Sequence, residues 1–182
     1  MKAAVAVAGA ALALTAATAD AQRAAAGCDP DNLGLKTLSD PQRDLVRLRP
    51  KATTIAAIDR LAHPHPTPTT RATGFQRQVW RVRGQIVEYR LEADGDLDLV
   101  LYDGKHSYLA ATMPPPRCLP ARTRARAAIV RARALFEGLC GPARFRWREL
   151  GATAVVDGVG YWGVRRPELR PITGLRLVAG CA

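Results

Sequence analysis

Serine and histidine are scarce in this chain of 182 residues, and their scarcity limits the chemistry it can perform. The serines are Ser39 and Ser107, and the histidines are His63, His65 and His106. His106 and Ser107 are adjacent on a predicted strand, so their side chains point to opposite faces and cannot form a base–nucleophile pair. The composition therefore disfavours a hydrolase with a serine nucleophile.

Closely spaced cysteines are also missing. No two of the four cysteines, Cys28, Cys118, Cys140 and Cys181, lie within 20 residues of each other. Zinc sites commonly use close pairs such as C-x-x-C, whereas an even number of widely spaced cysteines is typical of disulfides in exported proteins. We therefore expect two disulfide bonds, no thiol nucleophile and no cofactor.

Lysine and aromatic residues are few, and basic residues outnumber acidic ones. Lysine occurs at four positions, so arginine supplies most of the net charge of +11. A basic surface outside the cytoplasm can meet anionic lipid, an anionic envelope polymer or nucleic acid. Single-stranded nucleic acid requires several stacking aromatics, and only 5% of the residues are aromatic, which disfavours it. The expected partner is a protein or an anionic polymer.

Long apolar runs are lacking after the first residues of the chain. Met1–Ala21 has a short positive start, an apolar stretch rich in alanine, and small residues in Ala19-Asp20-Ala21, the pattern of a cleavable secretory signal. The stretch is too short and too rich in alanine to span a membrane. We predict cleavage after Ala21 and an exported protein, periplasmic or extracellular, with no transmembrane segment in the mature chain.

A lipid anchor is the alternative to this simple signal. Ala25-Ala26-Gly27-Cys28 is similar to a lipoprotein box, in which Cys28 would carry the lipid. The leucine usual three residues before the cysteine is missing, and the polar residues Asp20, Gln22 and Arg23 interrupt the apolar run. The pattern therefore favours the cleaved signal.

Residues 22–62 are predicted to form a small N-terminal extension of helical or irregular structure. Asp40-Pro41 combines a capping residue with proline at the first helical position, which predicts a helix that Pro50 ends. Thr53 or Thr54 is expected to cap a second short helix. Alternating prolines then predict an extended linker over residues 63–74.

Residues 75–182 carry the pattern of a β domain. In the first strand, from Phe75, the apolar parity switches beside Gly84, which predicts a β-bulge. Asp-Gly within residues 93–96 predicts a hairpin turn before a second strand, Leu97–Tyr102. The third predicted strand is His106–Met113.

A helix and two more strands are predicted to complete the chain. Ala121–Leu139 shows an apolar stripe at helical spacing, with arginines outside the stripe. The last two strands are Phe145–Trp162, broken near Gly151, and Ile172–Ala179, joined by a loop at Gly163–Pro171. Three strands, a helix and two strands are the order of the OB-fold, so we predict a mainly β (α+β) fold with a five-stranded OB-fold-like barrel and a helix between strands 3 and 4.

The predicted barrel bears on the cysteine pairing. Cys118, Cys140 and Cys181 follow strand 3, precede strand 4 and end strand 5, which places them at one end of such a barrel. A helix of 19 residues is about 28 Å long, so Cys118 and Cys140 at its two ends are not expected to bond. We favour Cys28–Cys118 with Cys140–Cys181; the alternative is Cys118–Cys181 with Cys28–Cys140.

The strand segment resembles a group of exported bacterial proteins of unknown function. Leu91–Asp103 matches their stretch L-E-x-D-x-D-x-x-L-V-L-x-D, and Pro114–Cys118 matches a P-x-P-x-C close. Weaker likeness extends to Lys36–Asp40 and Gly158–Trp162. Members usually carry histidine where this chain has Asp98, which is a departure at that position. The resemblance implies a fold and an exported location, and it implies no activity.

Binding is the function class that these patterns favour. OB-folds bind ligands along strands 2 and 3, between the loops joining strands 1 and 2 and strands 4 and 5. The residues expected there, our binding candidates, are Tyr102, His106, Tyr108, Arg165, Arg166 and Arg170. The leading hypothesis is thus a non-catalytic exported binding module.

Two other functions are weighed against it, a metal-dependent phosphodiesterase or nuclease and a weak nucleic-acid binder. Asp94, Asp96 and Asp98 are the carboxylates whose alternate spacing suggests a metal. A calcium loop also needs a glycine at its sixth position and a glutamate at its twelfth, where this chain has Leu99 and Lys105. A solvated hairpin turn is therefore the favoured interpretation, and we expect no metal.

Overall fold

The computed structural model of the chain describes residues 27–181, so the predicted signal at residues 1–21 lies outside the described part. Its helices are α2 (Leu33–Thr37), α3 (Ile55–Asp59) and α4 (Arg126–Cys140), with short 3-10 turns at Arg43–Leu45, Phe75–Arg77 and Pro116–Cys118. Its strands are β1 (Arg47–Ala52), β2 (Gln78–Leu91), β3 (Leu97–Tyr102), β4 (Tyr108–Met113), β5 (Arg148–Trp162) and β6 (Pro167–Ala179). The protein is mainly β, as the sequence predicts.

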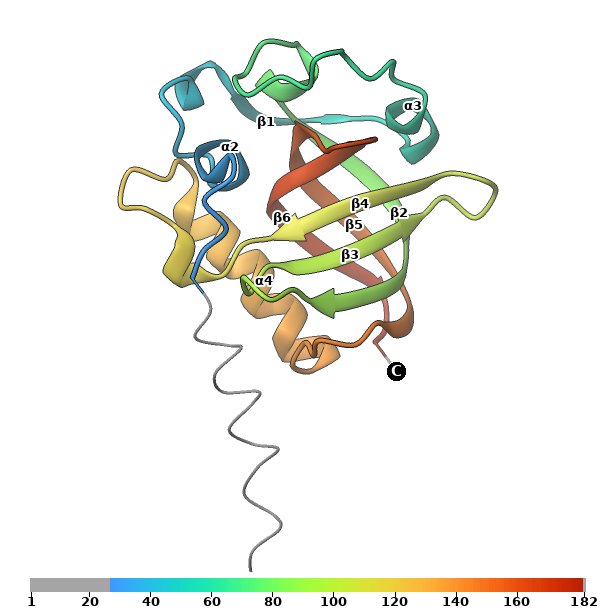
Figure 1. The fold of residues 1–182 in the computed structure, drawn as a ribbon. Coiled ribbons are helices and arrows are strands. Elements are labelled where there is room, and N and C mark those ends of the chain that lie inside the picture. Colours follow the sequence, from blue (N-terminus) through green and yellow to red (C-terminus); the bar gives the residue numbers. More distant parts are fainter. Residues whose placement is uncertain (1–26, 182) are drawn as a thin grey trace, which may run out of the picture.

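The strands form a six-stranded sheet in which five strands close a ring of hydrogen bonds (Figure 1). The order is β1-β2-β3-β4-β6-β5, and β5 pairs back with β2. β4 and β6 run parallel, whereas β5 is antiparallel to both β6 and β2. β1 lies outside the ring and pairs in parallel with β2.

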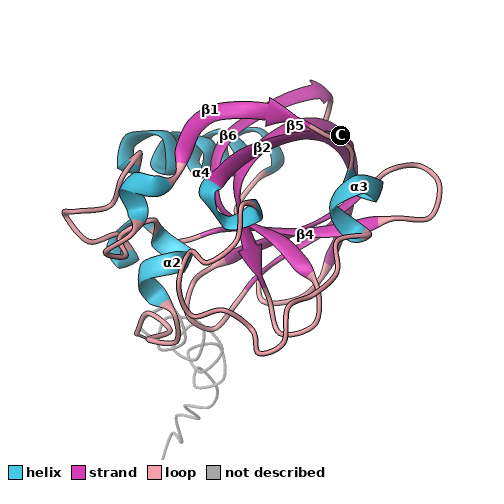
Figure 2. Ribbon diagram, turned by 90° about the horizontal axis from the view of Figure 1, so that it is seen from above, coloured by secondary structure: helices cyan, strands magenta, loops and turns pink. Residues whose placement is uncertain are grey.

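The main hydrophobic core joins the strands to the helices at both ends of the ring. Alternate residues of β3, namely Leu97, Leu99 and Leu101, are buried together with Phe136 of α4 and Ile55 of α3. Seen from above, α3 sits beside the open end of the ring (Figure 2). Both α4 and α3 therefore contribute side chains to the core inside the ring.

Strand β1 corrects the sequence prediction for this segment. The expected helix after Asp40-Pro41 is wrong: a 3-10 turn is followed by a strand at Arg47–Ala52. The Asp40 carboxylate accepts hydrogen bonds from the Gln42 N–H and from the Arg71 side chain. Gln78 of β2 also donates its side-chain amide to the Arg49 carbonyl. Long-range partners thus override the local helix signal.

Several local predictions are confirmed. The side chain of Thr54 caps α3 by accepting the Ala57 N–H at 3.1 Å. The bulge in β2 is present, although the register shifts at residues 86–88 and not beside Gly84. Gly95 takes φ +88° in the hairpin turn, a left-handed conformation that favours glycine. The predicted loop Gly163–Pro171 is wrong in length, because β6 begins at Pro167.

The structure contains the two disulfides expected, in the pairing favoured from the sequence. Cys28 bonds Cys118, and Cys140 bonds Cys181. Such bonds indicate an oxidising compartment. The Sγ atom of Cys28 is bonded to Cys118, so it is not available for the thioether of a lipid anchor. Within residues 27–181, no helix has both the length and the apolar character needed to cross a membrane.

Candidate functional site

Two tyrosines among the binding candidates stack on the outer side of the β3–β4 hairpin. Tyr102 and Tyr108 are paired across the strands, with ring centroids 4.7 Å apart and an interplanar angle of 23°. The Tyr102 hydroxyl donates to the Lys105 carbonyl at 2.7 Å. His106 is exposed in the same hairpin, and its backbone N–H donates to Asp103. The structure therefore brings these three candidates together at one hairpin.

The three arginine candidates separate into two different environments. Arg165 and Arg166 are exposed in the short loop between β5 and β6, beside the exposed Val164. Arg170 lies on strand β6, where its guanidinium forms an ion pair with Asp96. The guanidinium of Arg170 is already paired and mostly buried, so it is less accessible to a ligand than those of Arg165 and Arg166.

Arg170 is the centre of a buried cluster of charged side chains. Asp96 is 6% exposed, and the Thr112 hydroxyl donates to Asp98 at 2.7 Å. Burial raises the pKa of Asp96, Asp98 and Glu168, and the nearby Arg170 offsets part of the rise in each case. One guanidinium thus faces three carboxyl groups in a poorly hydrated environment, and the pKa of each carboxyl group is raised.

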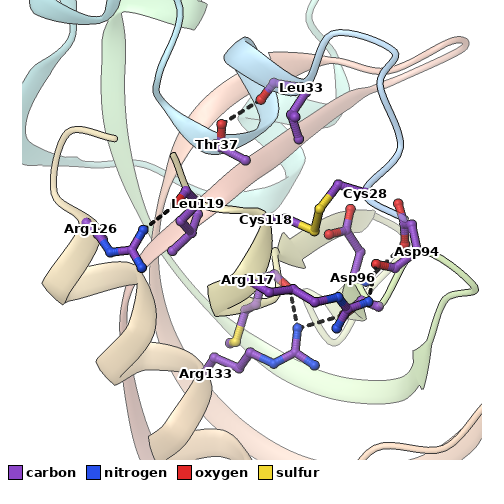
Figure 3. The surroundings of a disulfide bond; sticks show 12 residues. Cys28, Leu33, Thr37, Asp94, Asp96, Arg117, Cys118, Leu119, Arg126 and Arg133 are labelled. Atoms are coloured by element: carbon purple, nitrogen blue, oxygen red, sulfur yellow. Dashed lines mark hydrogen bonds between the residues drawn. A yellow bond between two sulfur atoms is a disulfide. The ribbon is translucent and has the colours of Figure 1, made fainter. Parts of the chain in front are cut away.

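The N-terminal segment, residues 28–37, covers this cluster. It packs against β6 and, with the 92–96 hairpin, it lines a narrow space that includes Asp96. The Cys28–Cys118 disulfide holds the segment beside the hairpin (Figure 3). Arg117 next to this disulfide donates to the Asp94 carbonyl at 2.9 Å. The N-terminal segment therefore occupies the surface between β6 and the hairpin at residues 92–96.

The carboxylates weighed as metal ligands have structural roles here. The Asp94 side chain accepts the Asp96 N–H at 2.9 Å within the hairpin turn, while Asp96 and Asp98 belong to the buried cluster. Among residues 27–181, no group of three or more histidine, cysteine, aspartate or glutamate side chains has the arrangement of a metal site. The geometry gives the phosphodiesterase hypothesis no support at this position.

The raised carboxyl pKa values predict an unusual pH dependence of stability. Because the folded state holds more protons than the unfolded chain above about pH 4, the cluster's contribution to the free energy of unfolding falls as the pH rises from there. Asp98→Asn keeps an acceptor for Thr112 and removes one titrating group. We expect the free energy of unfolding of this variant to fall less steeply as the pH rises. Chemical denaturation at a series of pH values measures this dependence.

The matched control is Asp44→Asn, which removes an acid whose side chain is 73% exposed. It should leave the pH dependence as it is in the unmodified protein. An unchanged pH profile in Asp98→Asn would contradict the assignment of the titration to the buried cluster.

A groove between β1, α3 and the turn before β2 was not foreseen from the sequence. It has a volume of about 500 Å³ and combines apolar side chains, including Phe75 and Trp80, with Arg47 and Lys51. The Lys51 ammonium lies 5.5 Å from the centroid of the Trp80 ring. The Trp80 indole N–H donates to the Phe75 carbonyl at 3.0 Å, which fixes the ring in the groove wall. The groove could not be predicted because it depends on strand β1.

A second groove adjoins the first at Thr53, which lines both. It has a volume of about 460 Å³ and is bordered by Arg81, Arg83 and Arg176. Its acidic residue, Asp157, forms a double hydrogen bond with Arg81, with both distances 2.7 Å. The two grooves together therefore present five basic side chains and one carboxylate that is already paired.

The backbone register sets the spacing of the arginines in the second groove. Arg83 pairs with Val155, and Val155 pairs with Arg176 on its other side. Neighbouring strands are about 4.8 Å apart, so the two arginines start about 10 Å apart on the same row. Neither has an ion pair or a side-chain hydrogen bond within residues 27–181. Two free guanidinium groups at fixed spacing are suited to an anion with repeated charges.

Comparison with known proteins finds no similar family: neither a family model nor a curated protein matches this chain.

Proposed function

We propose that this protein is an exported, non-catalytic binding module with the OB-fold, and that it binds an anionic polymer of the cell envelope. The observation that carries the proposal is the pair of adjoining grooves along β1 and β2, whose charged lining residues are basic apart from the paired Asp157.

The strand order supports the fold part of the proposal. If β2 to β6 are renumbered as strands 1 to 5, the strands of the ring are neighbours in the order 1-2-3-5-4. Strand 4 also pairs with strand 1, which closes the ring. Strands 3 and 5 run parallel, and strands 4 and 5 run antiparallel. The long bulged first strand and the helix between strands 3 and 4 agree with a five-stranded Greek-key barrel. The strand β1 is then an addition to that barrel.

The location part of the proposal depends on the signal pattern of Met1–Ala21 and on the disulfides. The segment resembling exported bacterial proteins, Leu91–Asp103, forms the end of β2, the hairpin and β3. We propose that the chain belongs with that group.

An extended polymer fits the grooves better than the other partners considered. The basic side chains follow one another from Arg47 and Lys51 to Arg83 and Arg176, over two connected hollows. For single-stranded nucleic acid, bases must stack on accessible aromatic faces, whereas the Trp80 ring faces Lys51. A flexible polyanion needs no such stacking, because charge-assisted contacts to spaced arginines suffice.

The test of this function is polyanion binding by the variant Arg83→Gln/Arg176→Gln. Each lost charge-assisted contact is worth about 1.5 kcal/mol or more, so we expect affinity for a fluorescent polyphosphate to fall at least tenfold. The salt dependence of binding should also become less steep, because fewer counterions are released. Fluorescence anisotropy at several salt concentrations measures both quantities.

The matched control is Arg165→Gln/Arg166→Gln, which removes the same charge from the β5–β6 loop. It should keep the affinity within about twofold, because neither arginine lines a groove, although the sequence made both of them binding candidates. Equal losses in both double variants would indicate general attraction to net charge and contradict a groove site. Tighter binding of polyglutamate or of oligonucleotides than of polyphosphate would point to a protein or a nucleic acid as the partner.

A further inference from the structure

One end of the molecule carries an unusual combination of basic and apolar side chains. α4 ends there, the chain passes through residues 141–147 into β5, and the C-terminus lies close by (Figure 1). The Cys140–Cys181 disulfide joins the end of α4 to the end of the described chain. The disulfide therefore ties the end of α4 to the segment that follows β6.

Arginine and aromatic residues alternate in residues 144–148, which lie at this end of the molecule and lead into β5. The sequence of this segment is Arg144-Phe145-Arg146-Trp147-Arg148, and its three arginines are exposed. Trp147 is 43% exposed, with the Arg90 guanidinium 4.4 Å from its ring centroid. The Arg144 carbonyl accepts the Leu91 N–H at 2.8 Å, which ties the segment to β2. The aromatic and basic groups are thus held in place at the surface.

The last turns of α4 add exposed aliphatic side chains to the same end. Leu139 is 55% exposed and Leu135 is 39% exposed, although both are large apolar residues of the helix predicted at Ala121–Leu139. They are four residues apart, so they share one face of the helix. Phe136 and Ala132 take the buried positions against the core. Large apolar side chains left in solvent beside arginines are a feature of interaction surfaces.

The acidic groups near this end include an ion-paired glutamate on α4 and an exposed glutamate, Glu149, directly after the segment. Glu137 forms an ion pair with Arg133 on α4 at 2.9 Å. Glu149 pairs across the strands with Glu88, on the face between β2 and β5. The segment from Arg144 to Arg148 therefore contributes three positive charges without a carboxylate among them.

We propose that this end of the molecule docks on the surface of an anionic lipid bilayer. Tryptophan and phenylalanine partition to the interface between lipid and water, while arginines attract acidic headgroups. Leu139 and Trp147 enter the interface, and Arg144 and Arg146 contact lipid phosphates. The charge of the segment favours an anionic membrane over an apolar protein surface, and the protein binds peripherally.

The experiment uses the mature protein with vesicles of phosphatidylcholine containing phosphatidylglycerol, and with vesicles of phosphatidylcholine alone. Co-sedimentation gives the partition coefficient, and brominated lipids report tryptophan insertion by fluorescence quenching. Trp147→Ala identifies the share of the quenching that belongs to this residue. Arg144→Gln/Arg146→Gln tests the charges, and Arg165→Gln/Arg166→Gln is the control with the same charge change.

We expect binding to the anionic vesicles and at least tenfold weaker binding to the neutral ones. Arg144→Gln/Arg146→Gln should weaken partitioning at least tenfold, since each arginine near an anionic surface contributes substantially. Trp147→Ala should lose most of the quenching, while the control double variant behaves as the unmodified protein. Absence of binding to anionic vesicles, or equal losses in the control, would overturn the proposal, as would quenching that persists without Trp147.

Membrane docking goes beyond the polymer-binding function and is tested separately from it. Arg83→Gln/Arg176→Gln should leave vesicle binding unchanged, because the second groove lies elsewhere on the sheet. If that groove variant alone abolished vesicle binding, the lipid headgroups would be occupying the polymer groove and the docking surface proposed here would be wrong.

Discussion

Replacing Arg71 with methionine is expected to lower the free energy of unfolding by about 3–5 kcal/mol, a large share of the stability of a single domain. The Arg71 residue is 1% exposed. Its guanidinium donates to Asp40 from two nitrogens, at 2.8 and 3.0 Å, and to the carbonyls of Leu35 and Gln76. Burial lowers the pKa of Arg71, and Asp40 counteracts this shift.

The expected loss of stability is large because the substitution leaves the buried hydrogen-bond partners of Arg71 unpaired. Without the guanidinium, the Asp40 carboxylate and the two carbonyls lose these bonds in a dry environment, which costs more than the lost attraction itself. Arg71 joins α2, the turn after it and the segment before β2. Its loss should therefore loosen the whole N-terminal segment.

Chemical denaturation of Arg71→Met, Asp40→Asn and the double variant measures this coupling. The double variant should be more stable than the sum of the single losses predicts, because it leaves no unpaired buried charge. Arg60→Gln, an exposed arginine on the linker side of α3, is the control and should change stability by less than about 0.5 kcal/mol. Additive losses in the cycle would show that the pair is not an energetic unit.

Removing the Cys28–Cys118 disulfide by replacing both cysteines with serine is expected to cost about 4–5 kcal/mol. The bond spans 90 residues, so it restricts the unfolded chain strongly. It also holds the segment over Asp96 and Asp98. The variant should therefore lose stability and expose the charged cluster to water, which would bring the carboxyl pKa values toward their ordinary range.

The second disulfide supplies the matched comparison. Cys140–Cys181 spans 41 residues, so its double serine variant should lose slightly less stability, by a fraction of a kcal/mol in the same entropy model. Chemical denaturation of both variants without reductant shows which of the two has the lower free energy of unfolding. A pH profile that stays the same after loss of Cys28–Cys118 would contradict the role of the N-terminal segment as a cover of the cluster.

Much of the fold could be predicted because its signals are local. Alternation of apolar residues over 97–102 indicates β3, Asp-Gly indicates the hairpin before it, and Thr54 caps α3 as expected. The order of strands and helix, together with the positions of the cysteines, led to the disulfide pairing present in the structure. These features depend on residues close in sequence or on the order of elements along the chain.

The binding surfaces were predicted less well. The sequence predicts a loop at Arg170, but this residue is on β6 in an ion pair with Asp96, under a segment that begins more than a hundred residues earlier. The grooves exist because β1 adds to β2 where a helix was expected. Neither feature has a signal within a window of neighbouring residues.

The sequence by itself thus determined the mainly β character of the protein, its basic charge, its two disulfides and the pattern of an exported chain. Tertiary structure alone decided which charges are buried around Arg170 and which stay free at Arg83 and Arg176. The physical reason is that the burial of a charged side chain depends on what packs over it. Here residues 28–37 cover one part of the outer surface of the ring, while Arg83 and Arg176 on another part remain open to a partner.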